Sequence, residues 1–126
     1  MTAPPTPKPP AKTEHRLSIR IDLAGGARIG PGKIALLEEI ARSGSISAAG
    51  RAMKMSYRRA WELVEDLNRN LGEPVVETAD GGSGGGGTRL TPGGERLVQQ
   101  YRAMERAATA TAQDYLTALG ALAPLP

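Results

Sequence analysis

The side chains with the clearest chemical role lie between Arg42 and Trp61, where every charged residue is basic. We call these cations the basic cluster: Arg42, Arg51, Lys54, Arg58 and Arg59. No acidic residue occurs between Glu39 and Glu62, although the formal net charge of the whole chain is only +3 at pH 7. Positive charges gathered without acidic neighbours favour a polyanion as partner. A helix-turn-helix is one compact way to present such a cluster to DNA.

Other kinds of chemistry have little support in the sequence. Cysteine is absent and His15 is the only histidine, so neither thiol chemistry nor a histidine-based metal site is expected. The neighbouring carboxylates Glu38–Glu39 and Glu65–Asp66 occupy adjacent helical positions, point apart, and are interpreted as solvated surface. Trp61 is interpreted as part of the core or its rim, with stacking on a nucleobase as the alternative. We therefore expect no enzyme, no metal and no cofactor.

The length of 126 residues fits one domain with tails. Residues 1–15 are rich in proline and lack periodic apolar positions, which predicts a disordered tail rather than a secretory signal. No segment approaches the roughly 18 consecutive apolar residues that a membrane helix needs. We therefore expect a cytoplasmic protein without membrane contact.

Two elements are expected before the basic cluster. The segment from Arg16 to Leu23 alternates apolar and polar residues, which predicts a strand with one buried face. The segment from Lys33 to Arg42 has helical spacing, and Ser43–Gly44 is expected to end that helix. Its apolar positions are Ile34, Leu37, Ile40 and Ala41.

The basic cluster itself is predicted to form two short helices and a turn. Ser45 is the expected N-cap of the first helix, Lys54–Met55 the turn, and Ser56 the N-cap of the second helix. The second helix has one apolar stripe, formed by Ala60, Leu63, Val64, Leu67 and Leu71. Its first turn presents Tyr57, Arg58 and Arg59 where recognition helices meet base edges and phosphates. A surface helix with a solvated charged face is the alternative.

The next segment predicts a β-wing. Pro74–Thr78 and Thr88–Thr91 are expected to form two strands around a flexible tip at Asp80–Gly87. Glycine lets the backbone lie against sugar-phosphate, and Arg89 supplies charge at the base of the wing. A P-loop would need a Lys-Ser/Thr pair after the last glycine, and this pair is missing. A hairpin tip with a purely structural role stays open.

The last segment predicts a long helix, with Thr91 as its cap and Pro92 at its first position. Apolar and small residues alternate in steps of four and three, as in a heptad seam. The seam residues are Leu97, Tyr101, Met104, Ala108, Thr111, Tyr115 and Ala118, widened by Val98, Leu116 and Leu119. This pattern favours a dimerisation helix over 92–120, with packing on its own domain as the alternative. Residues 121–126 are expected to fray.

Several of these motifs resemble the N-terminal domain of ModE-type molybdate-responsive transcriptional regulators, a winged helix related to the LysR type. The matching motifs are GSIS at 44–47, SYRRAW at 56–61, Asn68 with Leu71, VVE at 75–77, GGSGGGG at 81–87 and LTPGGERL at 90–97. The resemblance covers about Leu17 to Leu119. It implies a homodimer whose two winged helices bind a palindromic operator and control genes around molybdate uptake and molybdenum enzymes.

Carried over by position, the resemblance places Ser56–Arg59 at the start of the recognition helix and Gly84–Gly87 with Arg89 in the wing. Full-length members of the family continue into oxyanion-binding domains after the long helix, for which a chain ending at Pro126 has no room. We therefore expect a stand-alone DNA-binding version without the oxyanion-binding domains of the full-length family.

The expected fold class is thus mainly α with small β: a tail at 1–15, a winged helix-turn-helix at 16–91, the dimerisation helix and the frayed end. The expected DNA contacts are Ser45, Arg51, Lys54, Ser56, Tyr57, Arg58, Arg59, Gly84, Gly85, Gly86, Gly87 and Arg89. Ser56 to Arg59 would enter the major groove, and Arg51, Lys54 and the wing would hold phosphates. Two alternatives are a module that binds an acidic protein and a small oxyanion sensor using backbone N–H groups near Gly81–Gly87.

Overall fold

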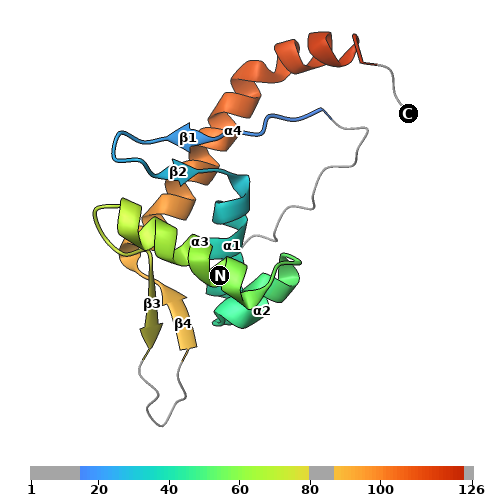
Figure 1. The fold of residues 1–126 in the computed structure, drawn as a ribbon. Helices are drawn as coiled ribbons and strands as arrows, with labels where there is room; N and C mark the ends of the chain where they lie inside the picture. The colour runs from blue at the N-terminus through green and yellow to red at the C-terminus, as the bar shows by residue number, and fades with distance from the viewer. Residues whose placement is uncertain (1–14, 80–86, 124–126) are drawn as a thin grey trace, which may run out of the picture. The chain divides into compact units, whose positions relative to one another are not determined.

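The computed structural model describes residues 15–79 and 87–123 (Figure 1). In these ranges the chain forms two antiparallel hairpins and a set of helices. In chain order the elements are β1 (Ile21–Asp22), β2 (Arg28–Ile29), α1 (Pro31–Ser43), α2 (Ile46–Ala52), α3 (Tyr57–Asn70), β3 (Val76–Ala79), β4 (Gly87–Leu90) and α4 (Pro92–Gly120). Of the predicted tails at 1–15 and 121–126, residues 1–14 and 124–126 lie outside the described residues, as does most of the predicted wing tip.

The N-terminal strand is much shorter than the alternation predicts. Only Ile21–Asp22 is in a strand, and it pairs with Ile29 and Arg28 of β2, a partner strand that the sequence analysis did not identify. The chain turns directly after Asp22, where the Leu23 N–H donates to the Ala27 carbonyl at 2.9 Å. This turn leaves Leu23 43% exposed, so its predicted place on a buried face is wrong.

Helix α1 begins at Pro31 and ends where Gly44 adopts a left-handed backbone with φ of 72°. The Gly44 N–H closes the last turn on the Ile40 carbonyl at 2.8 Å. Ile34, Leu37 and Ile40 are buried as predicted, but Leu36 is also buried and Ala41 is exposed. The buried face of α1 therefore extends to Leu36 and, at the C-terminal end of the helix, does not include Ala41.

Helices α2 and α3 form the predicted helix-turn-helix. Ser45 and Ser56 are the N-caps, and Lys54 in the turn has φ of 58°. Gly50 lets the two helices approach closely, because a Cβ there would lie 3.3 Å from the Cβ of Ala60. Ala60, Val64 and Leu67 of α3 are buried in the core formed around α1, and Leu63 and Leu71 pack at its edge.

Strands β3 and β4 form the predicted hairpin, which extends away from α3 (Figure 1). The register pairs Val76 with Leu90 and Glu77 with Arg89. At the far end of the described strands, the Thr88 N–H donates to the Gly44 carbonyl at 2.9 Å. The start of β4 is therefore fixed to the end of α1, beside the first helix of the helix-turn-helix.

Helix α4 starts as expected, because the Thr91 hydroxyl accepts the Gly94 N–H at 3.0 Å and donates to the Pro74 carbonyl at 2.6 Å.

The chain divides into two compact units, and the first of them, Ser18–Met104, includes the N-terminal part of α4. From the sequence we expect the winged helix-turn-helix to end at residue 91 and the dimerisation helix to begin at residue 92. The compact unit instead continues along α4 to Met104. The described residues of the other unit are 15–17 and 105–123. In the part of the chain that the model describes, no helix has the length and apolar character needed to span a membrane.

Candidate DNA-binding interface

The two serine caps set the backbone of the helix-turn-helix. The Ser56 Oγ accepts the Arg59 N–H at 3.1 Å, and the Ser45 Oγ accepts the Ala48 N–H at 3.0 Å. Each hydroxyl therefore satisfies one of the N–H groups that a helix start leaves without a partner. Both predicted DNA contacts thus have a structural role at the start of their helix, with Ser56 exposed and Ser45 half-buried.

The basic cluster is partly compensated, which corrects the view that all its charges lack partners. Arg42 pairs with Glu39, and the Arg58 Nε lies 3.1 Å from the Glu62 Oε1. Glu39 and Glu62 are the acids at the two ends of the acid-free segment. Each lies about one helical turn from the arginine that it contacts. The remaining cations of the cluster are Arg51, Lys54 and Arg59. They make no ion pair with a described residue.

The ion pair with Glu62 leaves the Arg58 side chain accessible to a ligand. Its side chain is 88% exposed, and that of Glu62 is 44% exposed. An exposed pair at i,i+4 on a helix stabilises by only about 0.3–0.5 kcal/mol, so DNA phosphates or bases can replace Glu62 at small cost. The first turn of α3 therefore presents two arginines to solvent, as the sequence predicts.

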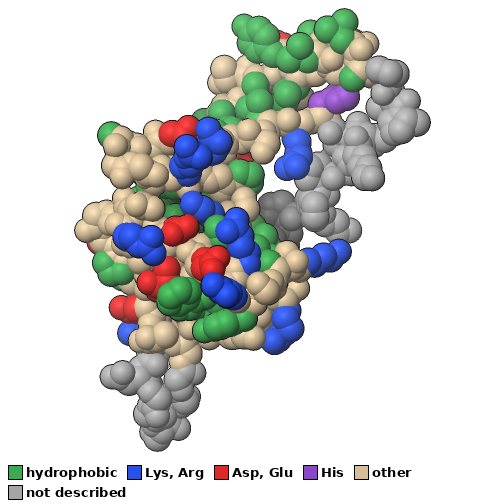
Figure 2. Space-filling model, viewed as in Figure 1, with side chains coloured by type: hydrophobic (Ala, Val, Ile, Leu, Met, Phe, Trp, Pro, Cys, Tyr) green, Lys and Arg blue, Asp and Glu red, His purple; other side chains and the backbone are tan. Residues whose placement is uncertain are grey.

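Two aromatic side chains share this surface. Tyr57 is 57% exposed and Trp61 is 45% exposed. Trp61 therefore lies outside the buried core and, of the two places interpreted from the sequence, it fits the rim of the core. Its position outside the apolar stripe of α3 is the sequence signal for this exposure. Figure 2 shows hydrophobic side chains at the surface among basic and acidic ones in the part of the molecule that contains α3.

The base of the wing is tied to α3 through Asn68. Its Oδ1 accepts the Val75 N–H at 2.8 Å and the Val76 N–H at 3.3 Å, and its Nδ2 donates to the Val76 carbonyl at 3.3 Å. In the sequence Asn68 is part of a motif, and this role was not predicted. These bonds fix the direction in which β3 leaves the helix.

Arg89 lies in the wing as predicted but has a cross-strand partner. Its Nε donates to the Glu77 Oε1 at 2.9 Å, and both side chains are substantially exposed. Gly87 begins β4 and is half-buried. The predicted wing contacts Gly84, Gly85 and Gly86 lie outside the described residues, as do Gly81–Ser83 of the proposed oxyanion site.

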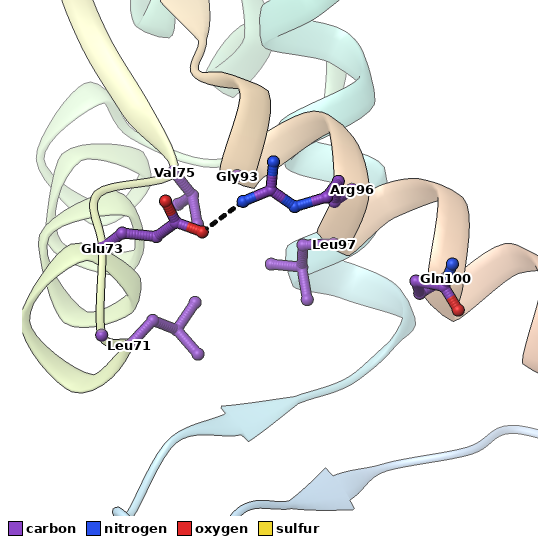
Figure 3. Close-up of a pocket in the computed structure, with 8 residues that line it drawn as sticks. Leu71, Glu73, Val75, Gly93, Arg96, Leu97 and Gln100 are labelled. Atoms are coloured by element: carbon purple, nitrogen blue, oxygen red, sulfur yellow. Dashed lines mark hydrogen bonds and ion pairs between the residues drawn. The ribbon is translucent and has the colours of Figure 1, made fainter.

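A surface hollow of about 600 Å³ lies between the end of α3 and the start of α4 (Figure 3). Leu71, Val75 and Leu97 supply apolar walls, and Arg96 reaches across to Glu73 with 2.5 Å between Nη2 and Oε1. The acid and the base of this hollow neutralise each other. Among the described residues, no group of three or more His, Cys, Asp or Glu side chains is placed to hold a metal ion.

The predicted dimer seam on α4 divides into two parts. Leu97, Tyr101 and Met104 pack against the core of their own chain, and Tyr101 is only 2% exposed. The Tyr101 hydroxyl donates to the Ile19 carbonyl at 2.7 Å, so this residue has an intramolecular role instead of the predicted place in the seam. The later residues differ: Thr111 is exposed, Tyr115 is 71% exposed and Leu119 is 62% exposed, while Ala108 is half-buried.

Comparison with solved structures agrees with this architecture. A LysR family transcriptional regulator, VV2_1132, superposes with a TM-score of 0.50 at 19% sequence identity, over 66% of this chain and 27% of that chain. A MarR family transcription regulator, SP03579, gives a TM-score of 0.54 at 20% identity, over 72% of this chain and 61% of that chain. These likenesses concern the fold, and they confirm the predicted winged helix-turn-helix.

Comparison with characterised proteins gives closer sequence relatives. The molybdenum-pterin-binding protein MopB of Rhodobacter capsulatus is 51% identical over 64% of this chain and 30% of its own length. The transcriptional regulator ModE of Haemophilus influenzae is 42% identical over 75% of this chain and 36% of its own length. The DNA-binding transcriptional dual regulator ModE of Escherichia coli is 45% identical over 56% of this chain and 27% of its own length. The chain thus spans about a third of these relatives, and the resemblance to ModE-type regulators is confirmed.

The model of bacterial regulatory helix-turn-helix proteins of the lysR family matches residues 32–95, about half of the chain. The match begins in α1, contains both helices of the helix-turn-helix and the wing, and ends in the first turn of α4. Such proteins are regulators of transcription, in agreement with the expectation that the chain is not an enzyme. The chain therefore belongs to the lysR family of bacterial regulatory helix-turn-helix proteins.

Proposed function

We propose that this protein is a transcriptional regulator that binds a palindromic operator in double-stranded DNA as a homodimer. The observation that carries the proposal is the first turn of α3, which exposes Arg58 and Arg59 to solvent. This turn belongs to the helix-turn-helix that the family model matches. The N-terminal residues of a recognition helix are the ones that contact base edges in the major groove. Binding to DNA would place this activity in the cytoplasm.

The remaining cations suit contacts to the DNA backbone. Arg51 and Lys54 are exposed at the end of α2 and in the turn that leads to α3. Phosphate contacts of this kind fix the position of a protein on the duplex without reading its sequence. Arg89 would add a phosphate contact from the wing after release from Glu77, and Gly84–Gly87 would bring the backbone close to the sugar-phosphate.

The names of the relatives point to the kind of genes that this protein would regulate. Their names include a molybdenum transport protein ModE from Azotobacter vinelandii and a molybdenum-pterin-binding protein MopA from Rhodobacter capsulatus. We infer that the operators of this protein lie beside genes for molybdenum uptake or molybdenum enzymes. The dimer contact would be formed by the later part of α4, from the half-buried Ala108 through the exposed Thr111 and Tyr115 to Leu119.

The test is a DNA titration with a duplex that the protein itself selects from a random-sequence pool. Lys54→Ala should weaken binding to all sequences alike and reduce the salt slope by about one, because one phosphate contact is lost. Arg58→Ala should cost about 1–3 kcal/mol at one preferred base pair and relax specificity there. Selection of no duplex, even at low salt, would refute DNA binding.

The matched control is Arg69→Ala, which removes the same kind of charge near the far end of α3. Arg69 pairs with Asp66 at 3.4 Å, and its side chain is 70% exposed. Its replacement should change DNA affinity far less than that of Arg58, because only the start of a recognition helix reaches the bases. Equal losses for Arg58→Ala on every sequence would refute its role in base recognition.

A further inference from the structure

Two of the exposed large hydrophobic side chains lie on the helix proposed to enter the groove. Among the described residues of the unit Ser18–Met104, the large hydrophobic side chains that are exposed are Leu23, Tyr57 and Trp61. Tyr57 and Trp61 are four residues apart, so they are neighbours on one face of α3. Arg58, three residues before Trp61, lies beside them. The chain thus exposes an aromatic pair next to its proposed base-reading arginine.

The direction of this face follows from Asn68. Asn68 is seven residues after Trp61, about two helical turns, and therefore lies on the same side of α3. Its side chain bonds to Val75 and Val76 at the start of the wing. The aromatic pair therefore lies on the side of α3 that faces β3, between the cations of the first turn and the base of the wing. A duplex that contacts both the first turn of α3 and the wing would have to cover this pair.

We propose that Trp61, with Tyr57 beside it, contacts thymine 5-methyl groups in the major groove and thereby makes the protein prefer A·T pairs next to the base pair that Arg58 reads. This inference rests on the proposed function. In the major groove the methyl group of thymine is the apolar feature that distinguishes the base pairs. The uncharged faces of the two rings match a methyl group, whereas the neighbouring arginine matches the acceptors of guanine.

The surroundings of the pair favour DNA over an acidic protein as the occupant. Arg58 lies beside it in the first turn, and Arg51 and Lys54 lie at the end of α2 and in the connecting turn, all within the helix-turn-helix that the family model matches. Removing apolar area of the tryptophan from water stabilises a complex that already has favourable charge. The aromatic pair would thus contribute sequence preference, while the cations contribute affinity.

The experiment replaces thymine by uracil, one position at a time, in the duplex that the full chain selects. Uracil keeps base pairing and all hydrogen-bonding groups and lacks only the methyl group. We expect the unaltered protein to lose about three- to fivefold in affinity at each contacted position. Trp61→Ala should bind the thymine duplex about tenfold more weakly, and its affinity should no longer depend on whether thymine or uracil occupies those positions.

The matched control is Leu23→Ala, which removes an exposed hydrophobic side chain outside this face and should keep the sensitivity to uracil. Thermal unfolding of both variants checks that the fold is retained, as expected for side chains near half exposure. Selected duplexes that bind equally with thymine and uracil would overturn this inference while leaving the proposed function intact. Equal weakening by Trp61→Ala on both duplexes would also overturn it, since Trp61 would then contact only the backbone. Failure to select any duplex would overturn both proposals.

Discussion

At the scale of single residues, Gly94 has the least space for a side chain among the glycines that the structure describes. A Cβ at this position would lie 2.1 Å from the carbonyl oxygen of Val75, which belongs to the backbone and already accepts the Thr91 N–H at 3.0 Å. The first turn of α4 therefore packs directly on the segment that leads into β3. Only glycine permits this approach, and the reason is steric.

We predict that Gly94→Ala lowers the free energy of unfolding by about 2–3 kcal/mol, because the backbone must shift to remove the clash. The matched control is Gly32→Ala in the first turn of α1, where nothing lies within 4 Å of an added Cβ. That change should be neutral or stabilising by up to about 1 kcal/mol. Urea unfolding of both variants measures the difference, and equal stabilities would contradict the packing described for Gly94.

A second prediction concerns the charge of Glu62. Glu62→Gln removes the partner of Arg58 and a negative charge near the proposed DNA path, so non-specific DNA should bind more tightly with a salt slope up to about one unit steeper. The free energy of unfolding should change by less than about 0.5 kcal/mol. Asp66→Asn, which breaks the pair with Arg69 one turn further along, is the control. If both variants bind DNA equally, Glu62 has no special relation to the interface.

At the scale of elements, the wing depends on its attachment to α3. Asn68→Ala would leave the N–H groups of Val75 and Val76 without the side-chain acceptor that they have now. We predict a loss of about 1–3 kcal/mol in the free energy of unfolding and faster hydrogen exchange at these two amides. Asn70→Ala, at the exposed end of the same helix, should leave both quantities nearly unchanged. Unaltered exchange in the Asn68 variant would show that the strand register alone holds the wing.

At the scale of the whole molecule, the exposed residues of α4 decide the proposed oligomer. Leu119→Glu places a charge on the face that includes Tyr115, and we expect sedimentation to give a monomer at concentrations where the unaltered protein is a dimer. Gln113→Glu adds the same charge on the other side of the helix and should leave the dimer intact. Identical masses for both variants and the unaltered protein would contradict the assignment of this face to dimerisation.

Local chemistry in the sequence determined where the helices begin and end. Ser45, Ser56 and Thr91 each supply a hydroxyl to a free backbone N–H, and Gly44 adopts a conformation that other residues disfavour. These interactions involve residues at most four positions apart, so the sequence contains all the information needed to predict them. The wing was predictable for a similar reason, because two short β-prone segments flank a glycine-rich one.

The tertiary structure decided which side chains are buried and which charges are paired. Tyr101 enters the core because the segment around Ile19 lies beside it, and Asn68 has a role because β3 passes its side chain. Trp61 stays 45% exposed at the edge of the core, and this exposure depends on how the neighbouring elements pack. Helical periodicity separates apolar from polar faces, but it contains no information about the neighbours that each face meets. Those neighbours depend on contacts between residues far apart in the chain, and they distinguish a core tyrosine from a dimer contact.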